Sequence, residues 1–318
     1  MTPSRIAVTG ATGFVGGAVA AVLTAKGHDV VCLVRRDPGP TFPWPARQVD
    51  ASDSGSLAAA LEDRDGVAHL AILNDFDRMY GQRRAAHDAY VGLTRRVVDA
   101  ANATGCTVGY VSTDWVFDGT GHLVSEDEPV NPVNFYGVLK AASELVVLER
   151  ARQGFVARVG GVQGVHRTRE AGPRSQDVGF GYFVLSLVDA LRSGDRFTVW
   201  EDPEINSVAT PITSSEIGAL LGRAFQRGVD GVLHLAGATA VTRRELAHAA
   251  CDVFDLDASM LDFGPPPSQA RLPAPVPYDT SMSGEVTMGR LGTRAHTVTE
   301  QLHALRRELD EGSAVPLS

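Results

Sequence analysis

Tyr136 and Lys140 stand four residues apart in the segment FYGVLKAASE, and on a helix this spacing places both side chains on one face. A free tyrosine has a pKa of about 10 and is a poor acid or base at neutral pH, whereas a nearby ammonium favours the phenolate and lowers that pKa. Thr113 directly follows the strand-like run Thr107–Ser112, and its hydroxyl is suited to binding a carbonyl oxygen. The three residues therefore predict proton transfer at a carbonyl or hydroxyl group. For the Tyr-x-x-x-Lys pair alone, which is common by chance, the alternative is packing beside a solvated charge.

A glycine-rich turn at Thr9–Gly16, with the sequence TGATGFVG, supplies a second chemical signal. Gly10 permits a tight turn after a strand, Gly13 lets the backbone approach a pyrophosphate, and Gly16 allows the next helix to pack close to the sheet. The first turn of that helix offers unpaired N–H groups and the positive end of its dipole to phosphates. Glycines also build ordinary turns, but a turn that follows a predicted strand and opens a predicted helix favours a dinucleotide site.

The residues that follow the strand-like run ending at Val34, and those at the end of the next strand-like segment at Asp50, indicate which nicotinamide cofactor is bound. NAD enzymes often place Asp or Glu after the second strand to bind the ribose 2′-hydroxyl, whereas this chain has Arg35 and Arg36. Two guanidinium groups suit a 2′-phosphate and favour NADP(H) over NAD(H), with a solvated arginine pair as the alternative. Asp50 and Ala51 are predicted beside the adenine. The alternative for Asp50 is a cap of the helix that starts near Ser54.

Alternating strands and helices are expected to position these residues. Short apolar runs separated by segments of helical apolar spacing indicate a parallel, doubly wound sheet. The predicted helices run from the glycine turn to Gly27, over Tyr90–Ala103 and over Tyr136–Arg150. The predicted strands are Arg5–Thr9, Val30–Val34, Val67–Ile72, Thr107–Ser112 and Phe155–Val159, with strand-like segments near Phe197 and Val232.

The predicted fold class is therefore α/β, a Rossmann-type doubly wound parallel sheet with a smaller C-terminal substrate lobe. We expect a dinucleotide-binding domain over residues 1–160 and mainly a substrate-binding lobe over residues 161–318, with residues of about 208–237 returning to the nucleotide domain. Arg167–Asp177 is rich in charge, Gly and Pro, and is predicted to be a loop and a candidate substrate lid. Gly264–Pro277 is Pro-rich and predicted to be irregular.

Composition limits the remaining classes of function. The chain has 318 residues, of which 44% are hydrophobic and 21% charged, as in ordinary soluble globular proteins. Its net charge of -9 argues against nonspecific nucleic-acid binding. Cys32, Cys106 and Cys251 form no C-x-x-C and the histidines show no ligand spacing, so we expect neither a disulfide framework nor a metal site. With no membrane-length apolar run and no signal peptide, we expect no membrane partner and a reducing, cytoplasmic setting.

Four segments resemble the extended short-chain dehydrogenase/reductase superfamily: TGATGFVG at Thr9–Gly16, HLA at His69–Ala71, STDWVFDG at Ser112–Gly119 and YGVLK at Tyr136–Lys140. Within the superfamily the chain looks most like the dTDP-4-dehydrorhamnose reductase group, because STDWVFDG is close to that group's STDYVFDG. The segments EPVNP at Glu128–Pro132 and GVLHLAGATAVTRRELAHAA also resemble that group. The resemblance runs from about residue 4 to at least residue 261.

The resemblance implies roles for the three reactive side chains. Tyr136 would be the general acid in reduction, Lys140 its pKa partner and the anchor of the cofactor ribose, and Thr113 the hydroxyl that orients the carbonyl. The superfamily pattern also implies cofactor contacts at the end of the predicted strand Val67–Ile72. It further implies that Val159 lies near the nicotinamide amide. The predicted cofactor contacts are Gly10, Thr12, Gly13, Phe14, Val15, Gly16, Arg35, Arg36, Asp50, Ala51, Leu70, Ala71, Ile72, Tyr136, Lys140 and Val159. The predicted substrate contacts are Asp114, Trp115 and Arg174.

Four positions depart from the pattern of the group. Tyr90 stands where the superfamily usually has Asn, and Leu139 where the residue before the lysine is often Ser. Val159 replaces a frequent Pro, and Gly161 replaces the Trp typical of the rhamnose group. The last two changes face the expected substrate side, so they argue against a deoxysugar nucleotide as the substrate while leaving reduction intact.

The insertion around Arg167–Asp177 is a further departure. Its arginines, Arg167, Arg169 and Arg174, could bind a substrate diphosphate, with a solvated charged loop as the alternative. Many relatives of this type form homodimers through the helix that carries the Tyr-x-x-x-Lys motif, and the sequence leaves the oligomeric state open.

Three hypotheses of function follow. The first is NADPH-dependent reduction of a ketone, with the C4 carbonyl of a nucleotide-linked (dTDP) 4-keto-6-deoxysugar as the preferred substrate. The second is an NAD(P)-dependent ketoreductase or epimerase acting on a non-sugar natural-product intermediate. The third is a non-catalytic NADP-binding regulatory subunit, because the resembling group includes a regulatory subunit of methionine adenosyltransferase. The intact pair of Tyr136 and Lys140 favours catalysis over a purely binding role.

Overall fold

A parallel sheet of seven strands organises the first half of the chain in the computed structural model, which describes residues 3–73, 75–168 and 176–318. Its strand order is β11-β6-β5-β4-β1-β2-β3, so the chain winds outward in both directions from β1 and β4. Ligands of such sheets bind at this reversal, outside the carboxyl ends of the strands. The predicted Rossmann-type α/β fold is confirmed. The strands are β1 (Arg5–Thr9), β2 (Asp29–Val34), β3 (Ala46–Gln48), β4 (Gly66–His69), β5 (Thr107–Thr113), β6 (Gly154–Val159), β7 (Val162–Gln163), β8 (Phe197–Trp200), β9 (Val208–Ala209), β10 (Ile212–Thr213), β11 (Gly231–Leu235), β12 (Val241–Thr242) and β13 (Leu261–Gly264).

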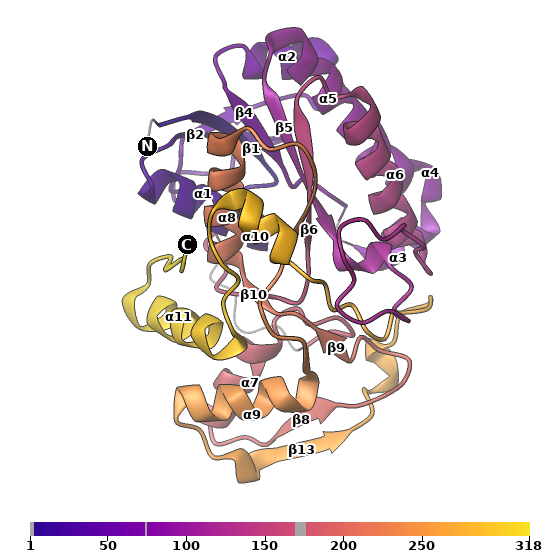
Figure 1. Cartoon of the computed structure of the whole chain (residues 1–318), viewed down its shortest axis with the longest axis vertical. Coiled ribbons are helices and arrows are strands. Elements are labelled where there is room, and N and C mark those ends of the chain that lie inside the picture. The colour runs from indigo at the N-terminus through magenta and orange to yellow at the C-terminus, as the bar shows by residue number, and fades with distance from the viewer. Residues whose placement is uncertain (1–2, 74, 169–175) are drawn as a thin grey trace.

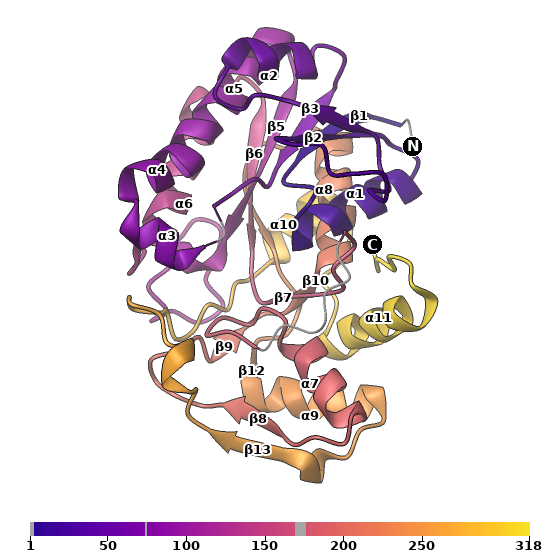
Figure 2. The ribbon, with the colours of Figure 1, turned by 180° about the vertical axis from the view of Figure 1, so that it is seen from behind.

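Helices cover both faces of the sheet, as Figures 1 and 2 show from opposite sides. On one face α1 packs against α8; on the other, α2, α5 and α6 lie side by side. The α-helices are α1 (Phe14–Ala25), α2 (Ser54–Leu61), α3 (Phe76–Gly81), α4 (Arg83–His87), α5 (Leu93–Thr104), α6 (Phe135–Arg150), α7 (Phe183–Arg192), α8 (Ser214–Arg227), α9 (Arg243–Phe254), α10 (Glu285–Leu291) and α11 (Val298–Glu311). Single turns of other helix types lie at Asp88–Gly92, Asp114–Val116, Ala258–Met260 and Ser268–Ala270.

A second, smaller lobe lies below the sheet in Figure 1 and contains α7, α9, β8 and β13. β8 and β13 pair in parallel. The apolar faces of α7, α9 and α11 share one buried cluster with these strands, including Phe183, Leu246 and Leu305. Between β8 and α9 the chain returns to the large sheet: α8 packs on α1, and β11 joins the edge of the sheet by pairing with β6.

Local sequence explains where several elements begin and end. The apolar run Val67–Ile72 predicts a strand to residue 72, but β4 stops at His69. The reason is Thr9, whose Oγ1 accepts hydrogen bonds from the N–H groups of Leu70 and Ala71 and turns the chain away from the ladder. In the lobe, Thr242 and Glu245 form a capping box that starts α9.

The predicted helix Tyr90–Ala103 is in fact two segments. A π-helical turn over Asp88–Gly92 holds Tyr90, and regular α-helix follows as α5. Short π-helical turns within α-helices occur frequently at functional sites because they re-aim single side chains. Here the re-aimed side chain is Tyr90, which points toward the residues described next.

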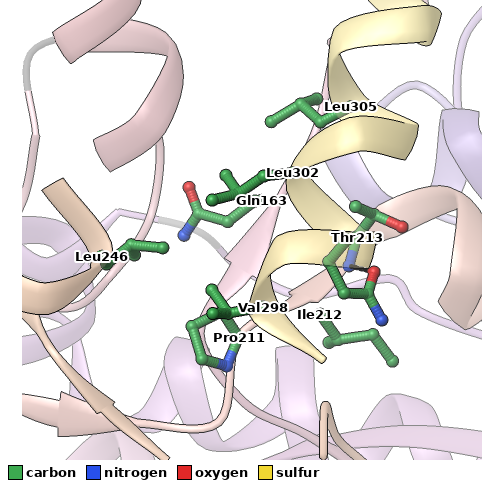
Figure 3. A pocket seen from close by; sticks show the side chains of 9 residues that line it. Gln163, Pro211, Ile212, Thr213, Leu246, Val298, Leu302 and Leu305 are labelled. Carbon is green, nitrogen blue, oxygen red and sulfur yellow. Dashed lines mark hydrogen bonds between the residues drawn. The ribbon is translucent and has the colours of Figure 1, made fainter. Parts of the chain in front are cut away.

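A small pocket of about 10 Å³ lies where β10, α9 and α11 meet, and Figure 3 shows its lining. Apolar side chains surround it, among them Ile212, Leu246 and Leu302. This volume is about the least that one water molecule needs. The cavity is therefore a packing defect between the lobe and the sheet and is too small for a substrate.

Candidate active site

The glycine turn between β1 and α1 is shaped to admit phosphates. Gly10 has φ of 75°, a left-handed conformation, and a Cβ there would lie 2.8 Å from the backbone N of Ala71. A Cβ on Gly16 would lie 2.7 Å from the carbonyl carbon of Gly10. Gly13 is the N-cap of α1 and makes no side-chain cap hydrogen bond, so the first N–H groups of the helix are left for a ligand. The turn therefore fits the pyrophosphate of a dinucleotide.

A segment of the second half of the chain crosses this turn, which the sequence did not indicate. Thr168 donates a hydrogen bond from Oγ1 to the carbonyl oxygen of Thr12 at 3.0 Å. The ring of Phe14 packs against Tyr182, with centroids 4.7 Å apart, and lies 6.3 Å from the ring of His166. The predicted cofactor residues Thr12 and Phe14 therefore also tie the phosphate turn to the chain that follows β7.

At the adenosine end, Arg35 and Arg36 directly follow β2 and are both exposed. Asp50 is exposed as well, and hydrogen bonds from the hydroxyl and N–H of Ser52 lower the pKa of its carboxyl group. The alternative interpretation of Asp50 as a helix cap is wrong, because Asp53 caps α2 by accepting from two backbone N–H groups. The carbonyl of Ala51 accepts a hydrogen bond from Arg96 at 2.7 Å, which fixes the backbone after β3.

The end of β4 lies between β1, which leads into the glycine turn, and β5, which ends at Thr113. Leu70 and Ala71 are partly buried and held by Thr9, while the side chain of Ile72 is 36% exposed. Thr9 also bonds the Nδ1 atom of His69 at 2.8 Å, and burial lowers the pKa of that fully buried imidazole to about 3. A neutral histidine therefore fixes the strand end that approaches the glycine turn.

The three predicted reactive residues converge beyond the ends of β5 and β6. α6 carries Tyr136 and Lys140, and its N-cap Asn134 accepts from the N–H of Gly137. Thr113 ends β5 and pairs in register with Val159, the last residue of β6. Burial raises the pKa of Tyr136 to about 12, against a hydrogen-bonding contact with the hydroxyl of Thr113 that lowers it. The structure thus brings Thr113 to the phenol that the sequence paired with it.

Lys140 is buried, with 3% of its surface exposed. Its Nζ donates to the carbonyl oxygen of Val111 at 2.8 Å and lies 5.0 Å from the centroid of the Tyr110 ring. Burial lowers the pKa of the lysine to about 7, against the opposing charge of Glu144. Neutral and protonated forms of Lys140 are therefore close in free energy near neutral pH.

Tyr90, which stands where the superfamily usually has Asn, fills the space behind the reactive pair. Its ring lies edge-on to Tyr136 with centroids 6.2 Å apart, and the Nζ of Lys140 lies 5.9 Å from its centroid. Its hydroxyl donates to the carbonyl oxygen of Leu73 at 3.0 Å. The phenol thus ties the chain after β4 to the π-helical turn, and an aromatic ring packs where an amide is usual.

Asp114 and Trp115 follow Thr113 at the substrate side of Tyr136. The ring of Trp115 lies edge-on to that of Tyr136 with centroids 5.9 Å apart. Asp114 is 4% exposed, and burial raises the pKa of its carboxyl group to about 6, against hydrogen bonds from Thr280 and Thr113. A buried carboxyl and an indole therefore lie beside Thr113 and Tyr136 on this side.

Three further aromatic and apolar residues pack beside Trp115 and together with it form an aromatic wall next to Tyr136. The sequence did not single them out. Phe76 lies 5.8 Å from the Tyr136 ring and 6.3 Å from Trp115. Val178 and Trp200 share a buried cluster with Trp115. They come from α3, the loop before α7 and the end of β8, so only the packing of the lobe on the sheet brings them together.

The structure also explains Gly161, which stands where the rhamnose group has Trp. Its φ is 53°, in the left-handed region that favours glycine. A Cβ at this position would lie 3.2 Å from the side chain of Ala209 and from the Cα of Pro211. The chain therefore has no room for a large side chain here, and the aromatic wall comes from other elements.

Of the predicted arginines in the insertion, Arg167 is engaged in the fold. Its guanidinium pairs with the buried carboxylate of Glu308 on α11 and donates to the carbonyl oxygens of Gly312 and Ser313. It is thus neither solvated nor directed at a substrate, contrary to both interpretations of that residue. Arg169 and Arg174 lie outside the described residues.

The described residues hold no cluster of three or more His, Cys, Asp and Glu side chains arranged for a metal ion. Among the helices that the structure describes, none is long and apolar enough to cross a membrane.

Comparison with known proteins defines the class to which the fold and the site belong. The chain is of the extended short-chain dehydrogenase/reductase type. Within this class it belongs to the family described as RmlD substrate binding domain, whose model matches residues 4–310. The resemblance to the dTDP-4-dehydrorhamnose reductase group is therefore confirmed.

Three relatives illustrate the range of names in this family. A probable low-salt glycan biosynthesis reductase, Agl14, from Haloferax volcanii is 27% identical over 311 residues, which cover 96% of this chain and 99% of the relative. A dTDP-4-dehydrorhamnose reductase from Mycolicibacterium smegmatis is 27% identical, over 86% of this chain and 75% of the relative. The methionine adenosyltransferase 2 subunit beta of Mus musculus is also 27% identical, over 81% of this chain and 74% of the relative.

Among solved structures, a dTDP-4-dehydrorhamnose reductase from Bacillus anthracis in complex with NADP superposes with a TM-score of 0.77. The alignment covers 96% of this chain and 100% of the other, at 18% sequence identity. At this identity the likeness shows that the whole fold is shared.

Proposed function

We propose that this protein is an NADPH-dependent reductase of a ketone, with a nucleotide-linked (dTDP) 4-keto-6-deoxysugar as its preferred substrate and Tyr136 as the general acid. The observation that carries the proposal is the convergence of Thr113, Tyr136 and Lys140 at the carboxyl ends of β5 and β6. The uncapped N-terminus of α1 lies on the same edge of the sheet, where doubly wound folds bind dinucleotides. The side chains proposed to react and the glycine turn proposed to bind the cofactor therefore lie at the same edge of the sheet.

In the proposed reaction each of these side chains has one role. When bound, reduced nicotinamide supplies the hydride. Tyr136 gives its phenolic proton to the oxygen that becomes an alkoxide. The hydroxyl of Thr113, which donates to Asp114 in this structure, would turn to donate its hydrogen bond to the same oxygen. In its protonated form, Lys140 favours the phenolate that Tyr136 becomes after giving up the proton, and its Nζ would hold the cofactor ribose. Trp115 and Phe76 exclude water from one side of the reacting carbon.

The preference for NADPH is supported by Arg35 and Arg36. Both guanidinium groups are exposed at the end of β2, where the adenosine ribose binds in folds of this kind. A 2′-phosphate there would receive charge-assisted hydrogen bonds that a 2′-hydroxyl cannot use fully.

The sugar-nucleotide substrate is supported by the names of the relatives. Two of them are a glycan biosynthesis reductase and a dTDP-4-dehydrorhamnose reductase. The aromatic wall formed by Phe76, Trp115 and Trp200 suits an apolar group beside the reacting carbonyl, such as the methyl group of a 6-deoxysugar.

The same wall also favours a second candidate, a ketoreductase acting on a non-sugar natural-product ketone or an epimerase. A third candidate, a regulatory NADP-binding subunit, is favoured by the likeness to the beta subunit of methionine adenosyltransferase 2. Both alternatives keep the cofactor site and differ in what happens at Tyr136.

The proposal includes a reducing, cytoplasmic setting. Cys32, Cys106 and Cys251 are free thiols and all three are buried. Burial raises the pKa of the Cys32 thiol to about 12, so it is unreactive as a nucleophile and acts in packing.

The test measures the consumption of NADPH and of NADH with a panel of dTDP-4-keto-6-deoxysugars and with non-sugar ketones. Tyr136→Phe is the matched control, because it removes one oxygen and keeps the ring. We expect turnover with a sugar nucleotide, faster with NADPH, and a loss of about 10²–10⁴-fold in Tyr136→Phe with unchanged NADPH affinity. Full turnover by Tyr136→Phe would overturn the catalytic assignment. Turnover with non-sugar ketones alone identifies the second candidate, and NADPH binding with no turnover and a co-purifying enzyme identifies the third.

A further inference from the structure

A buried ion pair lies one helical turn beyond Lys140 on α6. The guanidinium of Arg158 contacts the carboxylate of Glu144 in a forked arrangement, with Nη2 at 2.8 Å and Nε at 3.2 Å from Oε2. The two side chains are 5% and 3% exposed. Burying two charges costs free energy that ordinary packing does not require, so such a pair invites a functional explanation.

The pair joins the elements that carry the reactive residues. Glu144 lies on α6 with Lys140, and it accepts a short hydrogen bond from Ser112, the residue before Thr113. Arg158 lies on β6, directly before Val159. Its guanidinium also meets Nε2 of His234 at 3.3 Å and lies 5.1 Å from the centroid of the Phe117 ring.

Groups from four elements face Lys140, and they differ in charge. The rings of Tyr90 and Tyr110 approach it from the π-helical turn and from β5, and the buried imidazole of His69 from β4. Tyr136 and Glu144 share its helix, and Arg158 on β6 lies behind Glu144. The tyrosines are neutral because burial raises their pKa values, and His69 is neutral because burial lowers its pKa. Glu144 is the anion of this set, and it opposes the effect of burial on Lys140.

We propose that Glu144 and Arg158 are positioning residues that together set how much of Lys140 is protonated at neutral pH. Glu144 alone would hold a full ammonium beside it, and Arg158 reduces that field because its positive charge faces the same carboxylate. The ion pair thus leaves Lys140 free to change its charge during a catalytic cycle. The consequence for catalysis rests on the proposed function, in which Lys140 acts on Tyr136.

The composition of the chain makes a direct test accessible. Its lysines are Lys26 and Lys140, so a protein labelled with carbon-13 at the lysine side chains gives two sets of lysine signals. Lys26 is exposed and serves as the internal reference. Titration of the Lys140 signal in the full-length protein reports its charge without any turnover. In the wild type we expect its midpoint near the pKa of about 7 that burial produces.

Three variants test the proposal by the direction of the shift. In Glu144→Gln the Lys140 midpoint moves down by about one pH unit or more, because the opposing charge is gone. In Arg158→Gln it moves up, because Glu144 is no longer neutralised. The double variant returns close to the wild type. Circular dichroism identifies the variants that fold, and the direction in any one of them decides.

The proposal is overturned if Lys140 titrates as in the wild type in Glu144→Gln, if Arg158→Gln shifts it downward, or if the double variant shows the full downward shift. The pH dependence of kcat/KM in the same variants separates this proposal from the proposed function. Profiles that follow the Lys140 midpoints support both. If the Lys140 titration midpoint shifts and the pH dependence of kcat/KM does not, the ion pair controls the charge of Lys140 as proposed. Lys140 then has no part in the proposed reaction.

Discussion

The hydroxyl of Thr113 donates a hydrogen bond to Oδ1 of Asp114 at 2.9 Å, so the hydroxyl that we propose to bind the carbonyl is tied to a buried carboxyl group. Asp114 therefore orients the side chain of Thr113. Burial also raises the pKa of Asp114 to about 6, so the charge next to Tyr136 changes close to neutral pH.

Asp114→Asn should alter how stability depends on pH. The native pKa of Asp114 is raised, so its protonated form favours the folded state fully below the unfolded pKa of about 4. That contribution is lost as pH rises from about 4 through about 6. We expect the asparagine variant to lose this part of the pH dependence, a difference of up to about 3 kcal/mol across the window.

Urea unfolding at a series of pH values between 4 and 7 measures the effect. Asp77→Asn is the control for the loss of a carboxylate at the surface, because Asp77 is exposed on α3. Identical slopes for wild type and Asp114→Asn would show that Asp114 ionises as freely as a surface carboxyl.

The cofactor half of this protein was predictable from sequence because its determinants are local. Gly10, Gly13 and Gly16 act within one turn, and their spacing predicts the close backbone approaches that the structure shows. The parallel, doubly wound sheet follows from the same logic, because alternating strands and helices leave few ways to wind the chain. The error in β4 was also local, since a single hydroxyl of Thr9 ends the strand early.

The substrate side was less predictable because its residues meet only through tertiary packing. Phe76 and Trp200 are 124 positions apart in sequence, and neither belongs to a recognisable motif. Thr168 contacts the phosphate turn across a sequence separation of 156 residues. Glu144 and Arg158 lie in an apolar helix and strand, where a single sequence does not distinguish a buried ion pair from two surface charges.

Replacing both Arg35 and Arg36 by serine should weaken NADPH binding and spare NADH binding. Hydrogen bonds to a charged group contribute about 1.5–3 kcal/mol, so the dissociation constant for NADPH should rise about 10- to 100-fold. Fluorescence titration with each reduced cofactor measures both constants. Arg95→Ser, on the exposed surface of α5, is the matched control. Equal weakening for NADPH and NADH would contradict a 2′-phosphate site.

Gly16→Ala should disrupt the phosphate turn. The new methyl group would lie 2.7 Å from the carbonyl carbon of Gly10, and such overpacking costs about 1–3 kcal/mol. We expect a lower melting temperature and a large loss of cofactor affinity. Gly289→Ala is the matched control, because Gly289 is exposed within α10 and a Cβ there meets nothing within 4 Å. The control should be stabilised by about 0.5–1 kcal/mol, and a tolerated Gly16→Ala would refute the close approach.

Leu145→Asp should separate subunits if the protein forms a homodimer through α6. Val138, Leu145 and Leu148 are 46%, 57% and 39% exposed on the outer side of this helix. Large apolar side chains gathered on a surface commonly mark an interface. Light scattering of the wild type should give twice the mass of one chain, and that of Leu145→Asp the mass of one. A monomeric wild type would exclude this dimer.

Arg243→Met should loosen the loop that carries Val178. Arg243 is buried at the start of α9, and its guanidinium donates to the carbonyl oxygens of Asn206, Asp177 and Gly179. Methionine fills similar volume but leaves these acceptors unpaired, at a cost of about 3 kcal/mol. Because Val178 packs in one cluster with Trp115, we also expect KM to rise more than kcat falls.

The neighbouring Arg244→Met is the matched control for this effect. Arg244 is about half exposed, pairs with Glu201 and lies over the ring of Phe263. Exposed pairs of this kind contribute about 0–1 kcal/mol, so its replacement should change neither KM nor the unfolding midpoint appreciably. Similar losses in the two variants would mean that α9 responds to any change at its first turn. A loss confined to Arg243→Met would show that the buried guanidinium, by holding three carbonyl oxygens, fixes the wall that faces Tyr136.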